Sequence, residues 1–284
     1  AEIEALEDTP ARPSRTRKII VTELEDVRKK YAESRRTGIL YDYAEHAESE
    51  EDAIEDYPVT LFLSQHGYFK KITPQSLRMS GEQKFKEDDA LSMSVESSNA
   101  AELMFFTDKA QVYKTRASDF AKASQLGDYL PAKLGMDEGE NVMGMVLPGD
   151  YSGYMIFFFE NGKAAKVELS AYKTTSNRRR LTGAYSDKNP LKALLHLKED
   201  REIAVYSTEP RVLIVNTALL GVKTTRTTQG VALLTLKKKY VLDTVRFPEE
   251  TGITDLARYR GRSIPATGAL LKTEDSDDKQ LSLI

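Results

Sequence analysis

The stretch Met155–Tyr172, MIFFFENGKAAKVELSAY, decides the fold of this chain. An apolar run leads into Asn161-Gly162, a dipeptide typical of a type I′ hairpin turn, and a second strand-like run ends in a polar loop. Similar phrases recur along the chain, and a supersecondary unit repeated at such a spacing predicts stacked or radially arranged copies. The copies are Thr60–Leu77 (TLFLSQHGYFKKITPQSL), Leu103–Phe120 (LMFFTDKAQVYKTRASDF), Met155–Tyr172 and Val212–Gln229 (VLIVNTALLGVKTTRTTQ).

Further apolar stretches add strands to these hairpins. They precede the later copies and cover Ala90–Val95, Asn141–Leu147 and Glu202–Tyr206. Each unit therefore offers three or four short strands, which is the content of a propeller blade. A last, degenerate unit is predicted over residues 232–272, with a hairpin at Lys237–Lys239 and a strand near Ala266–Leu271. We expect an all-β, propeller-like body of about five blades.

The composition is that of a globular chain without cysteine. Charged residues make up 30% and hydrophobic residues 40% of 284 residues, and no apolar run approaches the roughly 18 residues of a membrane span. The absence of cysteine excludes disulfides and favours a cytoplasmic protein. Because His46, His66 and His196 are scattered, we expect no metal or other cofactor. The acidic start lacks both a signal peptide and an initial Met, which predicts that the chain begins inside a longer protein.

The net charge of −3 conceals a segregation of charge along the chain. Residues 41–56 carry eight acidic residues and no lysine or arginine, whereas residues 57–272 carry 31 basic and 24 acidic residues. We expect an acidic linker over 41–56, a basic body over 57–272 and an acidic tail over 273–284. A basic body favours a polyanionic partner, although an excess of this size is also ordinary for a solvated surface.

A helix is predicted ahead of the linker. Ile20, Leu24, Val27 and Tyr31 form a narrow apolar stripe on a helix from about Arg17 to Glu33. Such a stripe buries little apolar surface alone, so we interpret residues 1–40 as the remnant of a longer helical hairpin. The alternative is a surface helix that packs on the body.

The order of these segments carries a family resemblance. Ser64–Lys71 (SQHGYFKK) and Phe106–Lys114 (FTDKAQVYK) place a basic residue after the hairpin turn, and Lys30-Tyr31 followed by Arg35-Arg36-Thr37 precedes the acidic linker. Over nearly the whole chain this order resembles the end of the cleavage core and the C-terminal domain of bacterial type IIA DNA topoisomerase A subunits, those of DNA gyrase and topoisomerase IV.

The resemblance implies a β-pinwheel, in which propeller-like blades exchange strands, and a non-catalytic domain that binds and bends duplex DNA around its outer rim, largely independently of base sequence. It also implies a cleavage core with the catalytic tyrosine outside this chain, a partner B subunit with ATPase activity, and a nucleoid-associated location. The paired glycines that gyrase needs for supercoiling are missing from Leu77–Lys86 and Asn177–Gly183. The sequence therefore leans toward a topoisomerase IV-like or divergent gyrase-like protein.

A set of basic residues is predicted to contact DNA phosphates. They follow the hairpin turns or lie in the loops behind them, and this repeated placement distinguishes them from lysines that only protect sheet edges. The predicted contacts are Lys70, Lys71, Lys114, Arg116, Lys166, Lys173, Arg178, Arg179, Arg180, Lys223 and Arg226. For Lys237–Lys239, DNA contact and a plain hairpin tip are equally supported. Phe157–Phe159 are predicted to form a buried strand rather than a base-stacking surface.

No catalytic pattern accompanies the repeat. The sequence has neither a nucleophile elbow nor a P-loop, so we expect no enzyme activity from this chain by itself. The alternative function is a propeller scaffold that binds proteins. Among such scaffolds, the absence of tryptophan argues against a WD40 repeat.

Overall fold

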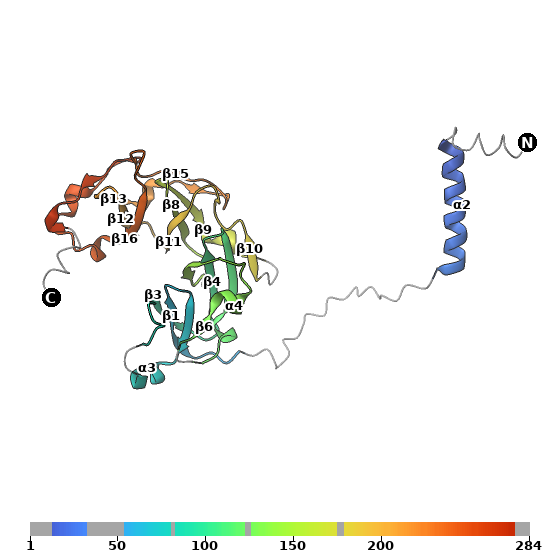
Figure 1. Cartoon of the computed structure of the whole chain (residues 1–284), viewed down its shortest axis with the longest axis horizontal. Helices are drawn as coiled ribbons and strands as arrows, with labels where there is room; N and C mark the ends of the chain where they lie inside the picture. The colour runs from blue at the N-terminus through green and yellow to red at the C-terminus, as the bar shows by residue number, and fades with distance from the viewer. Residues whose placement is uncertain (1–12, 33–53, 81–82, 123–125, 175–178, 276–284) are drawn as a thin grey trace, which may run out of the picture. The chain divides into compact units, whose positions relative to one another are not determined.

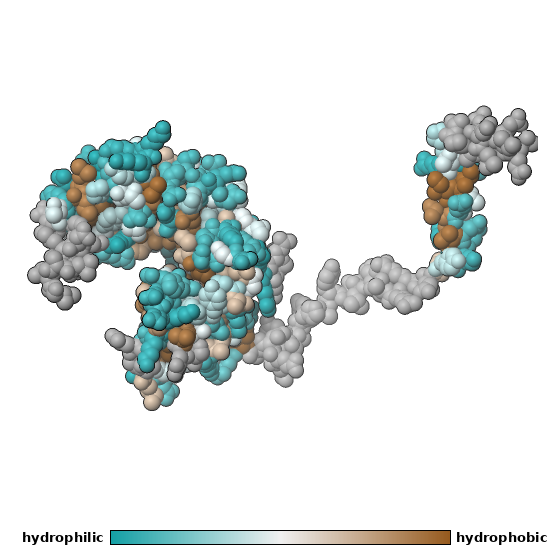
Figure 2. All heavy atoms as spheres, viewed as in Figure 1, coloured by the Kyte–Doolittle hydropathy of each residue, from teal (hydrophilic) through white to brown (hydrophobic). Residues whose placement is uncertain are grey.

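The computed structural model describes residues 13–32, 54–80, 83–122, 126–174 and 179–275. The chain divides into two compact units, residues 1–53 and 54–284. In the first unit, helix α2 (Pro13–Tyr31) confirms the predicted helix but begins earlier than Arg17, because proline is well accommodated in the first helical turn. Its apolar side chains are exposed, and Figure 2 shows them as a brown band on the helix. No helix in the described ranges is both long and apolar enough to cross a membrane.

The second unit contains four antiparallel hairpins, each at the centre of its own sheet. The hairpin turn predicted at Asn161-Gly162 is present, with the Gly162 amide donating to the Phe159 carbonyl over 2.9 Å, but the prediction of type I′ is wrong. A type I′ turn needs a positive φ at both central residues, whereas here Gly162 (φ +78°) ends the turn and Asn161 has no positive φ. The hairpins are β1 (Pro58–Ser64) with β2 (Tyr68–Ile72), β4 (Glu102–Thr107) with β5 (Gln111–Arg116), β8 (Tyr154–Phe159) with β9 (Lys163–Glu168), and β12 (Glu202–Ser207) with β13 (Arg211–Asn216).

Each hairpin gains a strand on both sides. On one side lie β3 (Leu91–Ser98), β7 (Val142–Val146), β11 (Leu191–Leu197) and β16 (Leu242–Arg246). On the other side lie β6 (Asp128–Tyr129), β10 (Arg180–Thr182), β14 (Val222–Lys223) with β15 (Val231–Ala232), and β17 (Ala269–Leu270). In the first three sheets this second strand is exchanged, because β6, β10 and β14 each follow the next hairpin in sequence but complete the preceding sheet. Strand β17 is not exchanged, because it pairs with the hairpin that it follows.

The sheets follow one another along an arc (Figure 1). Strands β3, β7, β11 and β16 contact one another in series and therefore line the inner side. The exchanged strands form the opposite, outer edge of the first three sheets, and β17 forms that edge of the fourth. Two short helices, α3 (Pro74–Ser80) and α4 (Leu130–Leu134), lie in the connections.

The prediction of about five blades is wrong, because the described residues form four sheets. Strands β16 and β17, which come from the predicted fifth unit, pair with β12 and β13 and complete the fourth sheet. The residues Lys237–Tyr240 form a turn that leads to β16. In place of a fifth hairpin the chain forms the 3-10 turns η5 (Pro248–Glu250) and η6 (Leu256–Tyr259), followed later by η7 (Thr273–Asp275).

The fourth repeat begins at Glu202, so the prediction of Val212 as its start is also wrong. Val212 lies in the return strand of the hairpin, and Glu202–Tyr206 is the first strand of the hairpin rather than an extra strand before it. The turn Thr208–Pro210 has no glycine, whereas Gly221 stands where the hairpin glycine was expected. The sequence alignment of the repeat was therefore displaced by one strand.

The apolar cores lie between consecutive sheets. Leu61 and Phe69 of the first sheet pack with Phe105 of the second, and equivalent clusters join the second to the third and the third to the fourth. Phe157–Phe159 are fully buried in two of these cores, as predicted. Beyond the fourth sheet, Ile253 and other residues of the terminal turns cover the last hairpin. Each of the first three hairpins thus has one face against the next sheet, and the fourth has one face against the terminal turns.

Candidate nucleic-acid interface

Three of the predicted lysines occupy one equivalent position in the first three hairpins, and we call them the strand lysines. Lys71 pairs with Leu61 across its hairpin, Lys114 with Met104, and Lys166 with Ile156. All three lie on the face that packs on the next sheet. Lys71 and Lys166 are each 3% exposed, and the side chain of Lys114 is 9% exposed.

Each strand lysine binds a 3-10 turn that belongs to the next hairpin. The Nζ atom of Lys71 donates to the Ala117 carbonyl in η2 (Ala117–Asp119) over 2.8 Å. Lys114 donates to the Tyr172 carbonyl in η3 (Leu169–Tyr172) over 3.2 Å. Lys166 donates to the Thr217 carbonyl in η4 (Thr217–Leu219) over 3.4 Å. The ammonium groups therefore tie consecutive sheets together.

A side-chain oxygen completes each of these sites. Lys71 donates to the Asn99 amide oxygen over 2.7 Å, Lys114 lies 3.0 Å from the Glu102 carboxylate, and Lys166 lies 2.6 Å from that of Asp200. Burial, with a contribution from nearby Lys122, lowers the pKa of Lys71.

Asp200 is held ionised by its partners. Burial alone would raise the pKa of Asp200, but hydrogen bonds from Lys166 and from the Thr217 hydroxyl hold it below its ordinary value. The charge of Lys166 is therefore already compensated within the fold.

Two further predicted residues also have internal partners. Lys70 is buried; its ammonium donates to the Lys84 carbonyl and lies 5.0 Å from the centre of the Phe85 ring, and burial lowers its pKa. Arg180 is exposed, but its guanidinium binds Gln111 and forms an ion pair with Asp137, which raises the pKa of Arg180. To contact phosphate, either side chain would first have to give up these partners.

The fourth hairpin has Ile214 at the position of the strand lysines. Ile214 pairs with Ala204, is fully buried, and packs with Ile253 and Tyr259 of the terminal turns. In the described part of the chain no further sheet follows, so this position has no next hairpin to bind. Lys223, predicted as the fourth copy of the repeated lysine, instead lies in β14 at the outer edge of the third sheet.

The other predicted cations lie in the segments that join each hairpin to its exchanged strand. These linking segments follow the second, third and fourth hairpins and are residues 117–127, 169–179 and 217–230; the third includes the short strand β14 and ends before β15. Six basic residues in or directly before them have no carboxylate within 4.0 Å among the described residues, and we call them the loop cations. They are Arg116, Lys122, Lys173, Arg179, Lys223 and Arg226. The first four are exposed and the last two half-buried. Arg178 lies outside the described residues.

Lys122 was missed by the sequence prediction. It comes six residues after the end of β5, close to the five residues that separate Lys173 from β9 and the seven that separate Lys223 from β13. Alignment of the linking segments, instead of the hairpins alone, would have identified it.

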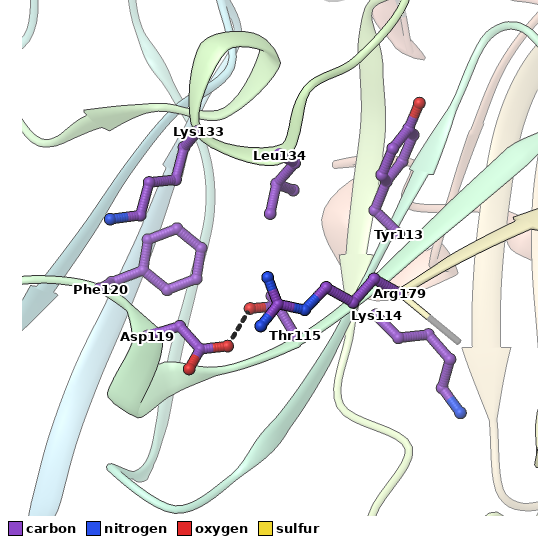
Figure 3. Close-up of a pocket in the computed structure, with 8 residues that line it drawn as sticks. All are labelled: Tyr113, Lys114, Thr115, Asp119, Phe120, Lys133, Leu134 and Arg179. Carbon is purple, nitrogen blue, oxygen red and sulfur yellow. Dashed lines mark hydrogen bonds between the residues drawn. The ribbon is translucent and has the colours of Figure 1, made fainter. Parts of the chain in front are cut away.

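Arg179 borders a pocket of about 250 Å³ between β5 and α4. Figure 3 shows its guanidinium pointing toward Asp119, while the ammonium of Lys114 points away. Burial opposes ionisation of Asp119, but the Thr115 hydroxyl and nearby arginines hold its pKa below the ordinary value. On the far side the pocket is lined by Lys133, another exposed cation that the repeat did not reveal because it lies in α4.

Comparisons with known proteins agree with this architecture. A family model described as DNA gyrase C-terminal domain, beta-propeller, matches residues 101–125, which contain the second hairpin. The DNA gyrase A protein of Streptococcus pneumoniae serotype 4 is 30% identical over 72% of this chain and 25% of its own length. That of Mycoplasma genitalium is 27% identical over 78% of this chain and 27% of its own length. The chain thus spans about a quarter of the curated relatives it matches.

A solved structure shares the fold. The crystal structure of the C-terminal domain of DNA topoisomerase IV superposes with a TM-score of 0.61, covering 70% of this chain and 64% of that chain at 19% sequence identity.

Proposed function

Because the chain belongs to the family of C-terminal domains of bacterial type IIA DNA topoisomerase A subunits, we propose that it binds and bends duplex DNA along the outer edge of its sheets. The observation that carries this proposal is the recurrence of loop cations without carboxylate partners in all three linking segments. Lysine and arginine at such positions favour phosphate oxygens, whose contacts position DNA without reading its sequence.

The arrangement of the linking segments favours a curved path for DNA. Each segment leads to an exchanged strand at the outer edge of a sheet, and the sheets follow an arc (Figure 1). A duplex that contacts successive segments has to bend. Because bending 20–30 base pairs costs on the order of 1–6 kcal/mol, several segments must contribute contacts together.

In the complete enzyme, this domain would present the bent DNA to the cleavage core of the same polypeptide, which carries the catalytic tyrosine, and would work with the ATPase-bearing B subunit. Residues 1–40 would be the end of the cleavage-core coiled coil, and residues 41–56 would be a linker that lets the body bind DNA at a distance from the core. The chain itself would not cleave DNA. This role places the protein with DNA in the bacterial cytoplasm.

A salt titration of DNA binding tests the proposal. Fluorescence anisotropy of the 284-residue chain with two duplexes of unrelated sequence, each about 30 base pairs long, should give similar affinities. The logarithm of the binding constant should fall linearly with the logarithm of salt concentration, by about 0.9 for each phosphate neutralised. Resonance energy transfer between labelled DNA ends should rise on binding. A folded sample that binds neither duplex at low salt would overturn the proposal in favour of a protein-binding scaffold.

A further inference from the structure

We propose that each strand lysine positions the loop cations of the linking segment that follows the next hairpin. The contribution of those loop cations to DNA binding then depends on the strand lysine of the preceding hairpin. This inference rests on the proposed DNA-binding function. It concerns Lys71, Lys114 and Lys166, which the fold buries away from solvent.

The ammonium of each strand lysine holds the first part of a linking segment. The acceptors of Lys71 and Lys166 are the carbonyls of Ala117 and Thr217, the first residues of their segments. The acceptor of Lys114 is the carbonyl of Tyr172, the residue directly before Lys173.

The backbone of each strand lysine also pairs with the backbone of the same linking segment, at a loop cation or at its neighbour. Lys71 forms a parallel β-bridge with Lys122. The Lys114 amide donates to the Arg179 carbonyl over 2.7 Å. Lys166 pairs with Val222, the neighbour of Lys223. Each strand lysine therefore fastens a linking segment at two places, and the loop cation lies within or next to the fastened part.

The junction between the second and third sheets adds aromatic contacts. The ammonium groups of Lys114 and Lys173 lie 5.0 and 6.0 Å from the centre of the same Tyr151 ring. The guanidinium of Arg226 lies 5.6 Å from the centre of the Tyr172 ring, whose own carbonyl binds Lys114. One buried ammonium is thus linked to two loop cations through shared neighbours.

The energetic reason is the cost of ordering a loop. A loop cation on a fastened segment loses little conformational freedom when it binds phosphate, whereas one on a loose segment loses more. Removal of the Lys114 ammonium also leaves the Tyr172 carbonyl without this donor. The contribution of Lys173 to DNA affinity should therefore depend on Lys114, although Lys114 itself does not reach the DNA.

A double-mutant cycle on the full chain tests this coupling. Lys173→Gln should weaken duplex binding about 3- to 10-fold in the wild-type background but less than about twofold in the Lys114→Met background. Lys114→Arg, which retains a donor, should restore most of the Lys173 effect. Amide hydrogen exchange in residues 169–179 should accelerate in Lys114→Met and not in Lys114→Arg.

Lys122→Gln tests whether the effect of Lys114 is confined to the linking segment that Lys114 binds. Its segment is fastened by Lys71 and not by Lys114, so Lys122→Gln should weaken binding equally in the wild-type and Lys114→Met backgrounds. Thermal unfolding of every variant establishes that the fold is retained. If Lys114→Met does not fold, the cycle of Lys166→Met with Lys223→Gln makes the same test at the next junction.

The outcomes separate this inference from the proposed function. Independent effects of Lys114→Met and Lys173→Gln, in a protein that binds duplex DNA, would overturn the inference and leave the function standing. A wild-type chain that is folded and binds no duplex would overturn both.

Discussion

The strand lysines and the loop cations carry the same charge and recur with the same repeat, yet they lie in opposite environments. Lys71, Lys114 and Lys166 are buried between sheets and have internal acceptors, whereas Lys122 and Lys173 are exposed in the linking segments. The difference follows from strand alternation: each strand lysine lies two residues after a core residue and so shares its face. A repeated basic residue therefore identifies an equivalent position, and the packing of the next sheet decides what that position does.

The most severe test of this comparison places a lysine where no next hairpin follows. Ile214→Lys should lower the free energy of unfolding by about 3 kcal/mol or more, because it buries an ammonium among Ile253 and Tyr259. Urea denaturation measures the loss, and Ile214→Leu, which keeps the volume, should cost less than about 1.5 kcal/mol. A lysine tolerated as well as this leucine would show that the position does not depend on a next hairpin.

The next test removes a strand lysine and compares it with a loop cation. Lys166→Met should lower the free energy of unfolding by about 1–3 kcal/mol, because the Asp200 carboxylate and the Thr217 carbonyl each lose a donor. Lys223→Met should change it by less than about 0.5 kcal/mol. Equal losses in the two variants would remove the distinction between buried and surface lysines.

A smaller effect should appear in the pH dependence of stability. The pKa of Asp200 is lowered in the folded chain, so its contribution is present above the unfolded-state pKa of about 3.9 and is lost as pH falls through the folded-state value. Asp200→Asn should therefore reduce the melting temperature at pH 7, and its difference from wild type should shrink as the pH approaches 3. A difference that stays constant over this range would contradict the ion pair.

Much of the fold could be predicted from the sequence, because the hairpins rest on local signals. The apolar runs and the Asn161-Gly162 turn identify three of the four hairpins. The fourth was displaced because Gly221, which resembles a hairpin glycine, lies after the return strand β13, and because the inner strand is Leu191–Leu197 and not the predicted Glu202–Tyr206. Without that displacement, strands β16 and β17 would have been assigned to the fourth sheet and not to a fifth.

The candidate interface was harder to predict than the fold. Alternation places Lys71 on the same face as Phe69, but it does not say that another sheet covers that face. Burial of Lys71, Lys114 and Lys166 depends on turns 46, 58 and 51 residues away in sequence. Lys173, Arg179 and Arg226, in contrast, were identified correctly as loop residues because polar loops are recognised locally.

The central claim is that the loop cations, and not basic residues in general, form the DNA-binding edge. The most direct measurement is the salt dependence of duplex binding by the variant Lys122→Gln/Lys173→Gln/Lys223→Gln. A control variant with the same change in charge replaces three other exposed lysines, Lys109, Lys188 and Lys198, with glutamine. The loop variant should lower the salt slope by about 2.7, three times the 0.9 expected for each phosphate contact, and the control should leave the slope unchanged. Equal slopes for the two variants would contradict the claim.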